Sequence, residues 1–284
     1  MAFQKVQRKA AKMRVAVAGP SGAGKTLSAL YLAYGVTGDW GKIALIDTEH
    51  GRGQFYGNRS DLEVGEYLYQ ELMPPFTVER YIAIAKEAEQ AVGPDGVIII
   101  DSFSHAWEGE GGVLDFKELT EQQQGKKQNI LINTLLSLNA HVIVTMRTKM
   151  AYAMEQNDRG KTVPVKIGLA PVQRENTEYE FDLVFNIARN HNASVSKDTT
   201  FLDNWNGVIT PALGTSLRNW LANGVEPDRC ADCGLVITGN AKKTADEIVK
   251  GTLKNYGRKL CWKCMAAEIK HQKEQKNEST PVSD

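Results

Sequence analysis

Short apolar runs alternate with longer amphipathic stretches through the first half of the chain. Four runs rich in Val, Ile and Ala have the length and composition of buried strands, at residues 13–18, 42–47, 96–101 and 141–146. Three stretches between them space their apolar positions as helices do, at residues 26–36, 75–92 and 130–138. Strands that alternate with helices predict an α/β fold whose mainly parallel sheet is flanked by helices.

Two segments interrupt this alternation. Residues 107–127 contain Gly109, Gly111 and Gly112 and then a run of Glu, Gln and Lys, and residues 148–175 are long and mixed, so both are predicted to be mobile loops. Further along, residues 181–188 and 193–196 predict a late hairpin, and residues 210–222 predict the last helix of this domain.

Composition and charge exclude some classes of protein. With 42% apolar residues, a chain of 284 residues can build a sizeable core. Its 34 Lys and Arg balance its 34 Asp and Glu, so the overall charge does not argue for a nucleic-acid or membrane partner. No apolar run approaches the roughly 20 residues of a membrane-spanning helix, and the stretch at 15–18 leaves no room for a signal peptide. We therefore expect a cytoplasmic protein without a membrane partner.

The chain divides into four parts by composition. Residues 1–12 form a basic arm, residues 13–224 hold the alternating pattern, and residues 225–270 contain all four cysteines. The last part, residues 271–284, is rich in Lys, Gln, Glu and Ser, which predicts a disordered tail.

A phosphate-binding loop lies between the first predicted strand and the first predicted helix. Its eight residues match the pattern G-x-x-x-x-G-K-[ST]: Gly19, Pro20, Ser21, Gly22, Ala23, Gly24, Lys25 and Thr26. Glycines at this place let backbone N–H groups surround a phosphate at a helix N-terminus. The motif therefore predicts ATP and Mg²⁺ as cofactors, with Lys25 on the β- and γ-phosphates and Thr26 on the metal.

Two carboxylates follow strands that would lie beside this loop. Asp101 ends the run Val97-Ile98-Ile99-Ile100, at the sheet edge where α/β proteins bind ligands, and we expect it to hold Mg²⁺. Glu49 lies just past the end of the second strand, where a general base for phosphoryl transfer is needed. A helix cap is the alternative role for Asp101, and a solvated loop residue is the alternative for Glu49.

The core resembles the RecA-like branch of P-loop ATPases over residues 13–224. Besides the phosphate loop, the resemblance rests on Asp47-Thr48-Glu49-His50, Ile100-Asp101-Ser102, Glu108-Gly109-Glu110-Gly111-Gly112 and Val144-Thr145-Met146-Arg147-Thr148-Lys149. With Glu178-Tyr179-Glu180-Phe181-Asp182, it is most similar to the phage AAA-type ATP-binding proteins of the Sak-like group, which are associated with single-strand annealing and recombination. The resemblance implies an ATPase that self-associates with ATP at the protomer interface, acts on single-stranded DNA, and, if phage-encoded, works in the host cytoplasm.

Roles for single residues also come from the resemblance. Glu49 takes the place of the catalytic glutamate, and Thr145 falls where the family has a polar residue that senses the γ-phosphate. A cation acting on a neighbouring protomer would be Lys166 or Arg174, and the resemblance does not choose between them. Residues 148–175 have a mildly basic excess with Tyr152 as a stacking residue, which suits a loop that faces DNA.

The cysteines form two C-x-x-C pairs. Four thiolates from two such pairs predict a closed tetrahedral Zn²⁺ site, made by Cys230, Cys233, Cys261 and Cys264. The spacer at residues 244–253 predicts a helix, and the module would bind either DNA or a protein partner, such as a single-strand-binding or replication protein. Two other functions stay open at this point, a nucleotide-gated module that recruits replication proteins and a motor ATPase that is independent of DNA.

Overall fold

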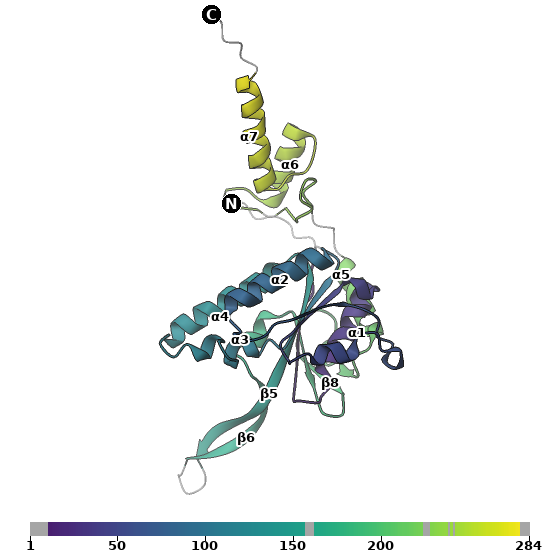
Figure 1. The fold of residues 1–284 in the computed structure, drawn as a ribbon, viewed down its shortest axis with the longest axis vertical. Coiled ribbons are helices and arrows are strands. Elements are labelled where there is room, and N and C mark those ends of the chain that lie inside the picture. The colour runs from purple at the N-terminus through teal and green to yellow at the C-terminus, as the bar shows by residue number, and fades with distance from the viewer. Residues whose placement is uncertain (1–10, 157–161, 224–227, 238, 241, 279–284) are drawn as a thin grey trace, which may run out of the picture. The chain divides into compact units, whose positions relative to one another are not determined.

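The computed structural model describes residues 11–156, 162–223, 228–237, 239–240 and 242–278, and the side chains of 150–169 and 273–278 are also outside this description (Figure 1). Two compact units are present. The first comprises Lys12–Leu221, and the second contains the described residues from Ala222 onward. In these ranges no helix has both the length and the apolar composition that crossing a membrane requires.

The first unit is built on one sheet with the strand order β3-β2-β4-β5-β1-β7-β8-β9, in which β6 pairs with β5 outside this path. The strands are β1 Arg14–Gly19, β2 Ile43–Asp47, β3 Leu68–Glu71, β4 Val97–Asp101, β5 His141–Gln156, β6 Thr162–Pro171, β7 Leu183–Ile187, β8 Ala193–Asp198 and β9 Asn206–Gly207. All pairs from β3 to β7 are parallel, whereas β7–β8, β8–β9 and β5–β6 are antiparallel. The mainly parallel sheet predicted from the alternating pattern is thus confirmed.

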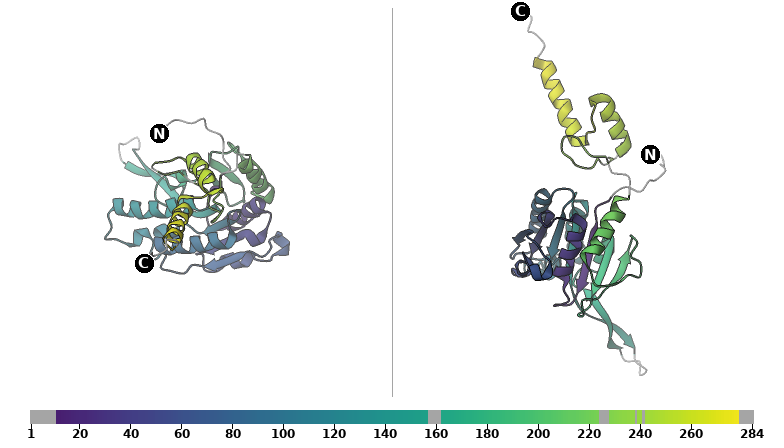
Figure 2. Two further views of the ribbon diagram at one scale, coloured as in Figure 1. Left: turned by 90° about the horizontal axis from the view of Figure 1, so that it is seen from above. Right: turned by 90° about the vertical axis from the view of Figure 1, so that its right-hand side faces the viewer.

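Helices cover both faces of this sheet (Figure 2). They are α1 Lys25–Thr37, α2 Val78–Val92, the short α3 His105–Glu108, α4 Glu121–Ser137 and α5 Pro211–Ala222. Successive residues of a strand point to opposite faces, and in β4 this places Ile98 and Ile100 against α2 and α4, and Val97 and Ile99 against α1 and α5. The unbroken apolar sequence of β4 follows from this burial on two sides.

A close approach of two backbones joins α1 to α5. Gly35 of α1 lies against Gly214 of α5, and a Cβ added at Gly214 would lie 2.3 Å from the carbonyl oxygen of Leu32. Only glycine permits this separation. The helix that follows the phosphate loop is therefore fixed by the last helix of the unit.

Both segments predicted as mobile loops contain regular structure, so the prediction of a loop was wrong for most of 148–175 and for the two ends of 107–127, while residues 109–120 form a connection without an α-helix or strand. Residues 107–127 include the end of α3 and the start of α4, where Thr120 and Gln123 form a capping box and Glu, Gln and Lys favour the helix. Most of residues 148–175 form an antiparallel arm in which β5 continues past the sheet and pairs with β6, from Thr148 with Pro171 to Gln156 with Thr162 (Figure 1). The edge strand β3 was not predicted because its side chains are mostly exposed and it lacks an apolar pattern.

The second unit packs two helices, α6 Ala245–Tyr256 and α7 Trp262–Glu278, on a small core of Cys230, Ile237, Ile248, Val249 and Leu260. Thr244 caps α6 in a capping box with Glu247. Helix α7 continues past His271 to Glu278, where composition predicted disorder. Its Gln, Lys and Glu residues are good helix formers, and low hydrophobicity alone does not prevent a helix from continuing. Residues 1–10 of the basic arm predicted at 1–12, and residues 279–284, lie outside the described residues.

Candidate functional site

The phosphate loop connects β1 to α1 through a backbone that needs glycine. Gly22 and Gly24 adopt φ values of 78° and 87°, in the left-handed region that disfavours side chains. Gly19 has no room for a side chain, because a Cβ there would lie 2.6 Å from the carbonyl oxygen of Ile187 in β7. Lys25 begins α1, and its Nζ donates to the carbonyl oxygen of Pro20 at 3.1 Å. The loop thus has the strand-loop-helix context that a phosphate site requires.

Asp101 stands at the end of β4 and is held by two hydroxyl groups. Thr26 Oγ1 donates to its Oδ2 and Thr145 Oγ1 donates to its Oδ1, each at 2.5 Å. Burial raises the pKa of Asp101, and the two hydroxyl donors act in the opposite direction. Because Mg²⁺ takes oxygen ligands and keeps several waters, the hydroxyl of Thr26 and the carboxylate of Asp101 fit its chemistry. The two residues predicted for Mg²⁺ are therefore brought together.

Thr145 was predicted to sense a γ-phosphate. In the structure its side chain is fully buried, and its hydroxyl donates a hydrogen bond to Asp101, the carboxylate predicted to hold Mg²⁺. A contact between Thr145 and the γ-phosphate stays a prediction.

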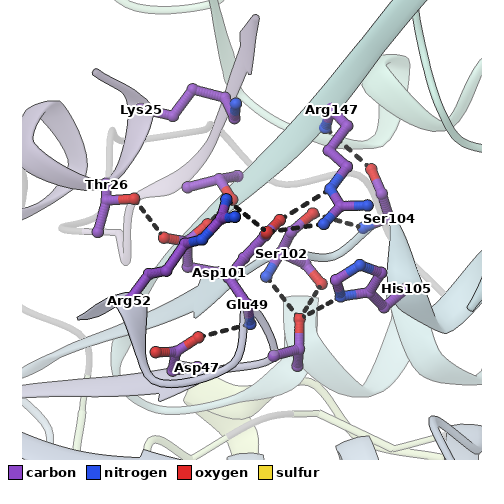
Figure 3. A network of polar contacts seen from close by, with 12 residues as sticks. Lys25, Thr26, Asp47, Glu49, Arg52, Asp101, Ser102, Ser104, His105 and Arg147 are labelled. Carbon is purple, nitrogen blue, oxygen red and sulfur yellow. Dashed lines mark hydrogen bonds and ion pairs between the residues drawn. The ribbon is translucent and has the colours of Figure 1, made fainter. Parts of the chain in front are cut away.

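Glu49 lies beside this pair, on the turn that follows β2 (Figure 3). Its backbone N–H donates to Asp47 Oδ1 at 2.5 Å, and Asp47 Oδ2 accepts from the backbone N–H of Gly53 at 2.8 Å, which fixes the turn. Its carboxylate accepts two hydrogen bonds from Arg147, from Nε to Oε1 at 2.8 Å and from Nη2 to Oε2 at 2.7 Å. Burial raises the pKa of Glu49, but the hydrogen bonds and charge of Arg147 and the charges of His105 and Lys25 together outweigh it, so the pKa lies below its ordinary value.

A buried hydroxyl ties the turn after β2 to the segment after β4. Thr48 Oγ1 accepts from the backbone N–H of Ser102 at 2.8 Å and lies 2.7 Å from His105 Nδ1. The backbone N–H of Thr48 donates to the carbonyl oxygen of Asp101 at 2.7 Å. These hydrogen bonds therefore hold the turn that carries Glu49 against the strand end that carries Asp101.

Sequence reasoning did not select Arg147, Thr48 or His105 as site residues. A signal for Arg147 was present, because it follows Thr145 by two positions and side chains two apart on a strand lie on the same face. No comparable signal marks His105, whose contact with Thr48 depends on the pairing of β2 with β4.

Of the two candidate trans-acting cations, Arg174 has a described side chain, and its contacts are with α4. Arg174 donates from Nη1 to Asn129 Oδ1 of α4 at 2.9 Å. Lys166 lies in β6, and its side chain is outside the described residues. Their action on a neighbouring protomer stays a prediction.

The four cysteines of the second unit form one cluster. Their sulfur atoms all lie within 4.8 Å of one another, and Cys233 Sγ lies 3.7 Å from Cys261 Sγ. Sulfurs at the corners of a tetrahedron with Zn–S bonds of about 2.3 Å are about 3.8 Å apart, so the cluster has the size of a Zn²⁺ site. Gly234, at φ 71°, closes the first knuckle by donating from its N–H to the carbonyl oxygen of Cys230 at 2.9 Å. The four predicted ligands fit the metal.

Comparison with known families agrees with this geometry. No curated protein matches the chain. The family model described as AAA domain matches residues 11–210, which is well over half of the chain and includes the phosphate loop, Glu49, Asp101 and Arg147. This chain therefore belongs to the AAA domain family and is a P-loop ATPase of that family, with a four-cysteine cluster that follows the matched region.

Proposed function

We propose that this protein hydrolyses ATP with Mg²⁺ by a RecA-like mechanism and that hydrolysis is coupled to single-stranded DNA in recombination or strand annealing. The observation that carries the catalytic part is the convergence of three elements on the phosphate loop. Thr26 of α1 bonds to Asp101 of β4, and the Glu49 carboxylate lies on the adjacent turn after β2.

Binding would use the loop backbone and Lys25. The N–H groups of the glycine-rich loop and the N-terminus of α1 favour the negative charge of the phosphates, and the Lys25 ammonium adds a cation on the same side. Thr26 and Asp101 would hold Mg²⁺, which supplies neutralisation of the charge on the β- and γ-phosphate oxygens.

Glu49 would act as the general base. Hydrolysis requires a water aligned with the γ-phosphate and a group that accepts its proton. The ionised form of Glu49 is favoured by its charged neighbours, and its turn is fixed through Asp47 and Thr48. An ionised carboxylate in a fixed place meets both requirements.

The arm made by β5 and β6 supports the DNA part of the proposal. It continues directly from the half of β5 that carries Thr145 and Arg147. Over residues 148–171, Lys149, Arg159, Lys161 and Lys166 stand against two acidic residues, and Tyr152 offers a ring for stacking. A basic excess with an aromatic residue in this stretch of sequence suits the phosphates and bases of a single strand.

The test is steady-state ATP hydrolysis with and without single-stranded DNA at two salt concentrations. Glu49→Gln, which should bind ATP and not hydrolyse it, is the blank. Stimulation by DNA that weakens as salt rises supports the whole proposal. A rate of hydrolysis that does not change when DNA is added would favour a DNA-independent motor ATPase. Slow turnover with ATP-dependent self-association would favour a module that recruits replication proteins through its cysteine unit. An active Glu49→Gln protein would remove Glu49 from the role of base.

A further inference from the structure

We propose that Arg147 is the positioning residue of Glu49, whose carboxylate it holds in the orientation needed to accept a proton from water. This inference rests on the proposed role of Glu49 as the base. Arg147 acts through Glu49 in this proposal and need not touch the nucleotide.

The contact between the two side chains is a two-point fork. Nε and Nη2 of Arg147 each donate to a different oxygen of Glu49, at 2.8 and 2.7 Å. Two parallel hydrogen bonds fix both the position and the rotation of a carboxylate, which a single contact does not do. Glu49 is also the more buried partner, since its side chain is 14% exposed and that of Arg147 is 41% exposed.

The backbone of Arg147 is itself held from two directions. Its N–H donates to Ser104 Oγ at 2.9 Å, and its carbonyl oxygen accepts from the N–H of Val172 at 2.7 Å. It also lies opposite Gly19, the first residue of the phosphate loop, in the pairing of β5 with β1. The fork therefore stands on a backbone that is fixed relative to the phosphate loop.

Other charged groups surround Glu49, and they do not duplicate the fork. Lys25 of α1 and His105 of α3 favour its ionised form, Asp101 of β4 carries like charge, and Asp47 of β2 accepts the N–H of Glu49 itself. Arg52, which follows the same turn, brings Nη1 to 3.8 Å from Glu49 Oε2, but it is 66% exposed and makes no hydrogen bond to the carboxylate that the structure describes. Arg147 alone among the described residues combines charge with two-point geometry.

Three variants separate charge from geometry. Arg147→Met removes both, Arg147→Lys keeps a cation without the fork, and Arg52→Met is the matched control that removes a nearby cation from the same carboxylate. Each is compared with the unchanged protein in kcat, in KM for ATP and in the pH dependence of kcat. Binding of a fluorescent ATP analogue and thermal unfolding show whether each variant is folded and loaded.

We expect Arg147→Met to lower kcat by about 100-fold, since a displacement of a catalytic group by about 1 Å can cost that much, with little change in KM. Because Arg147 lowers the pKa of Glu49, the acidic limb of the pH profile should move to higher pH in this variant. Arg147→Lys should keep the limb near its original place while kcat stays reduced, and Arg52→Met should change neither.

Three results would overturn the inference, and they are distinguishable. If Glu49→Gln abolishes hydrolysis but Arg147→Met leaves kcat and the pH limb unchanged, Glu49 remains the base and Arg147 does not position it. If Glu49→Gln hydrolyses ATP at the original rate, the proposed base is wrong and the inference fails with it. A loss confined to KM in Arg147→Met would also overturn it, because that would place Arg147 on the nucleotide.

Discussion

Replacing Thr145 by Val tests what the buried hydroxyl of β5 does. Val has nearly the same shape as Thr, so the main change is loss of the hydrogen bond from Thr145 Oγ1 to Asp101 Oδ1. A hydrogen bond to an ionised group contributes about 1.5–3 kcal/mol. Without it the pKa of the buried Asp101 rises further, so Mg²⁺ has to compete with a proton for the carboxylate.

We expect the Mg²⁺ concentration for half-maximal hydrolysis to rise by roughly 10- to 100-fold in Thr145→Val, because each 1.4 kcal/mol is a factor of ten. The assay is ATP hydrolysis against Mg²⁺ concentration at saturating ATP. Thr148→Val is the matched control, because Thr148 lies on the same strand and its Oγ1 is buried without a hydrogen-bond partner among the described residues. Removing that hydroxyl should leave the Mg²⁺ requirement unchanged.

The opposite pattern would refute this reasoning. If Thr145→Val keeps its Mg²⁺ requirement but loses the preference for ATP over ADP, then Thr145 senses the γ-phosphate, as the family resemblance implies. Equal effects of Thr145→Val and Thr148→Val would show that a general disturbance of β5 is being measured.

Three further changes test other parts of the molecule. Removal of the metal with a chelator should abolish the protection of the α6 amides from hydrogen exchange, and so should Cys233→Ser. The amides of β4 should stay protected, because the cluster stabilises only the second unit. Loss of protection in β4 would contradict this. Gly214→Ala should lower the free energy of unfolding of the first unit in urea by about 1–3 kcal/mol or more, because the added Cβ meets backbone that cannot move aside. Gly251→Ala in α6, where a Cβ meets no atom within 4 Å, is the control and should not destabilise the protein. Burial lowers the pKa of His141 from 6.5 to about 3, with its Nδ1 accepting the N–H of Met13 at 2.9 Å. Below pH 6.5 the unfolded chain binds a proton that the folded protein does not, so the free energy of unfolding should fall as pH decreases from 6.5 toward 3; an equally steep pH dependence in His141→Gln would show that another group is responsible.

The fold was predictable because its central strands are apolar on both faces. A run such as residues 97–100 has few alternatives to a covered strand, and the helices between such runs fix the parallel order. The first half of α4 and the arm were missed for the opposite reason. Their sequences are polar and mixed. The start of α4 is regular because of its capping box, and the arm is regular because β5 pairs with β6, and composition predicts neither.

The site was predictable wherever a residue type is needed at a strand end. The phosphate loop, Asp101 and Glu49 each lie at or just past the end of a strand, so a motif is enough to find them. The fork of Arg147 on Glu49 was not predictable, because it depends on β4 lying between β2 and β5 in the sheet. The order of the strands in the sheet cannot be deduced from their order along the chain.

Strand β5 is a single length of backbone from the middle of the sheet to the end of the arm. The nine residues from Thr148 to Gln156 extend for about 30 Å at the usual rise of about 3.3 Å per residue. Covalent backbone and the ladder of β5 with β6 connect this stretch to Arg147, with one register shift between Ala151 and Tyr152. The same strand that pairs with β6 in the arm pairs at Arg147 with Gly19, so the arm and the first residue of the phosphate loop are joined by one strand.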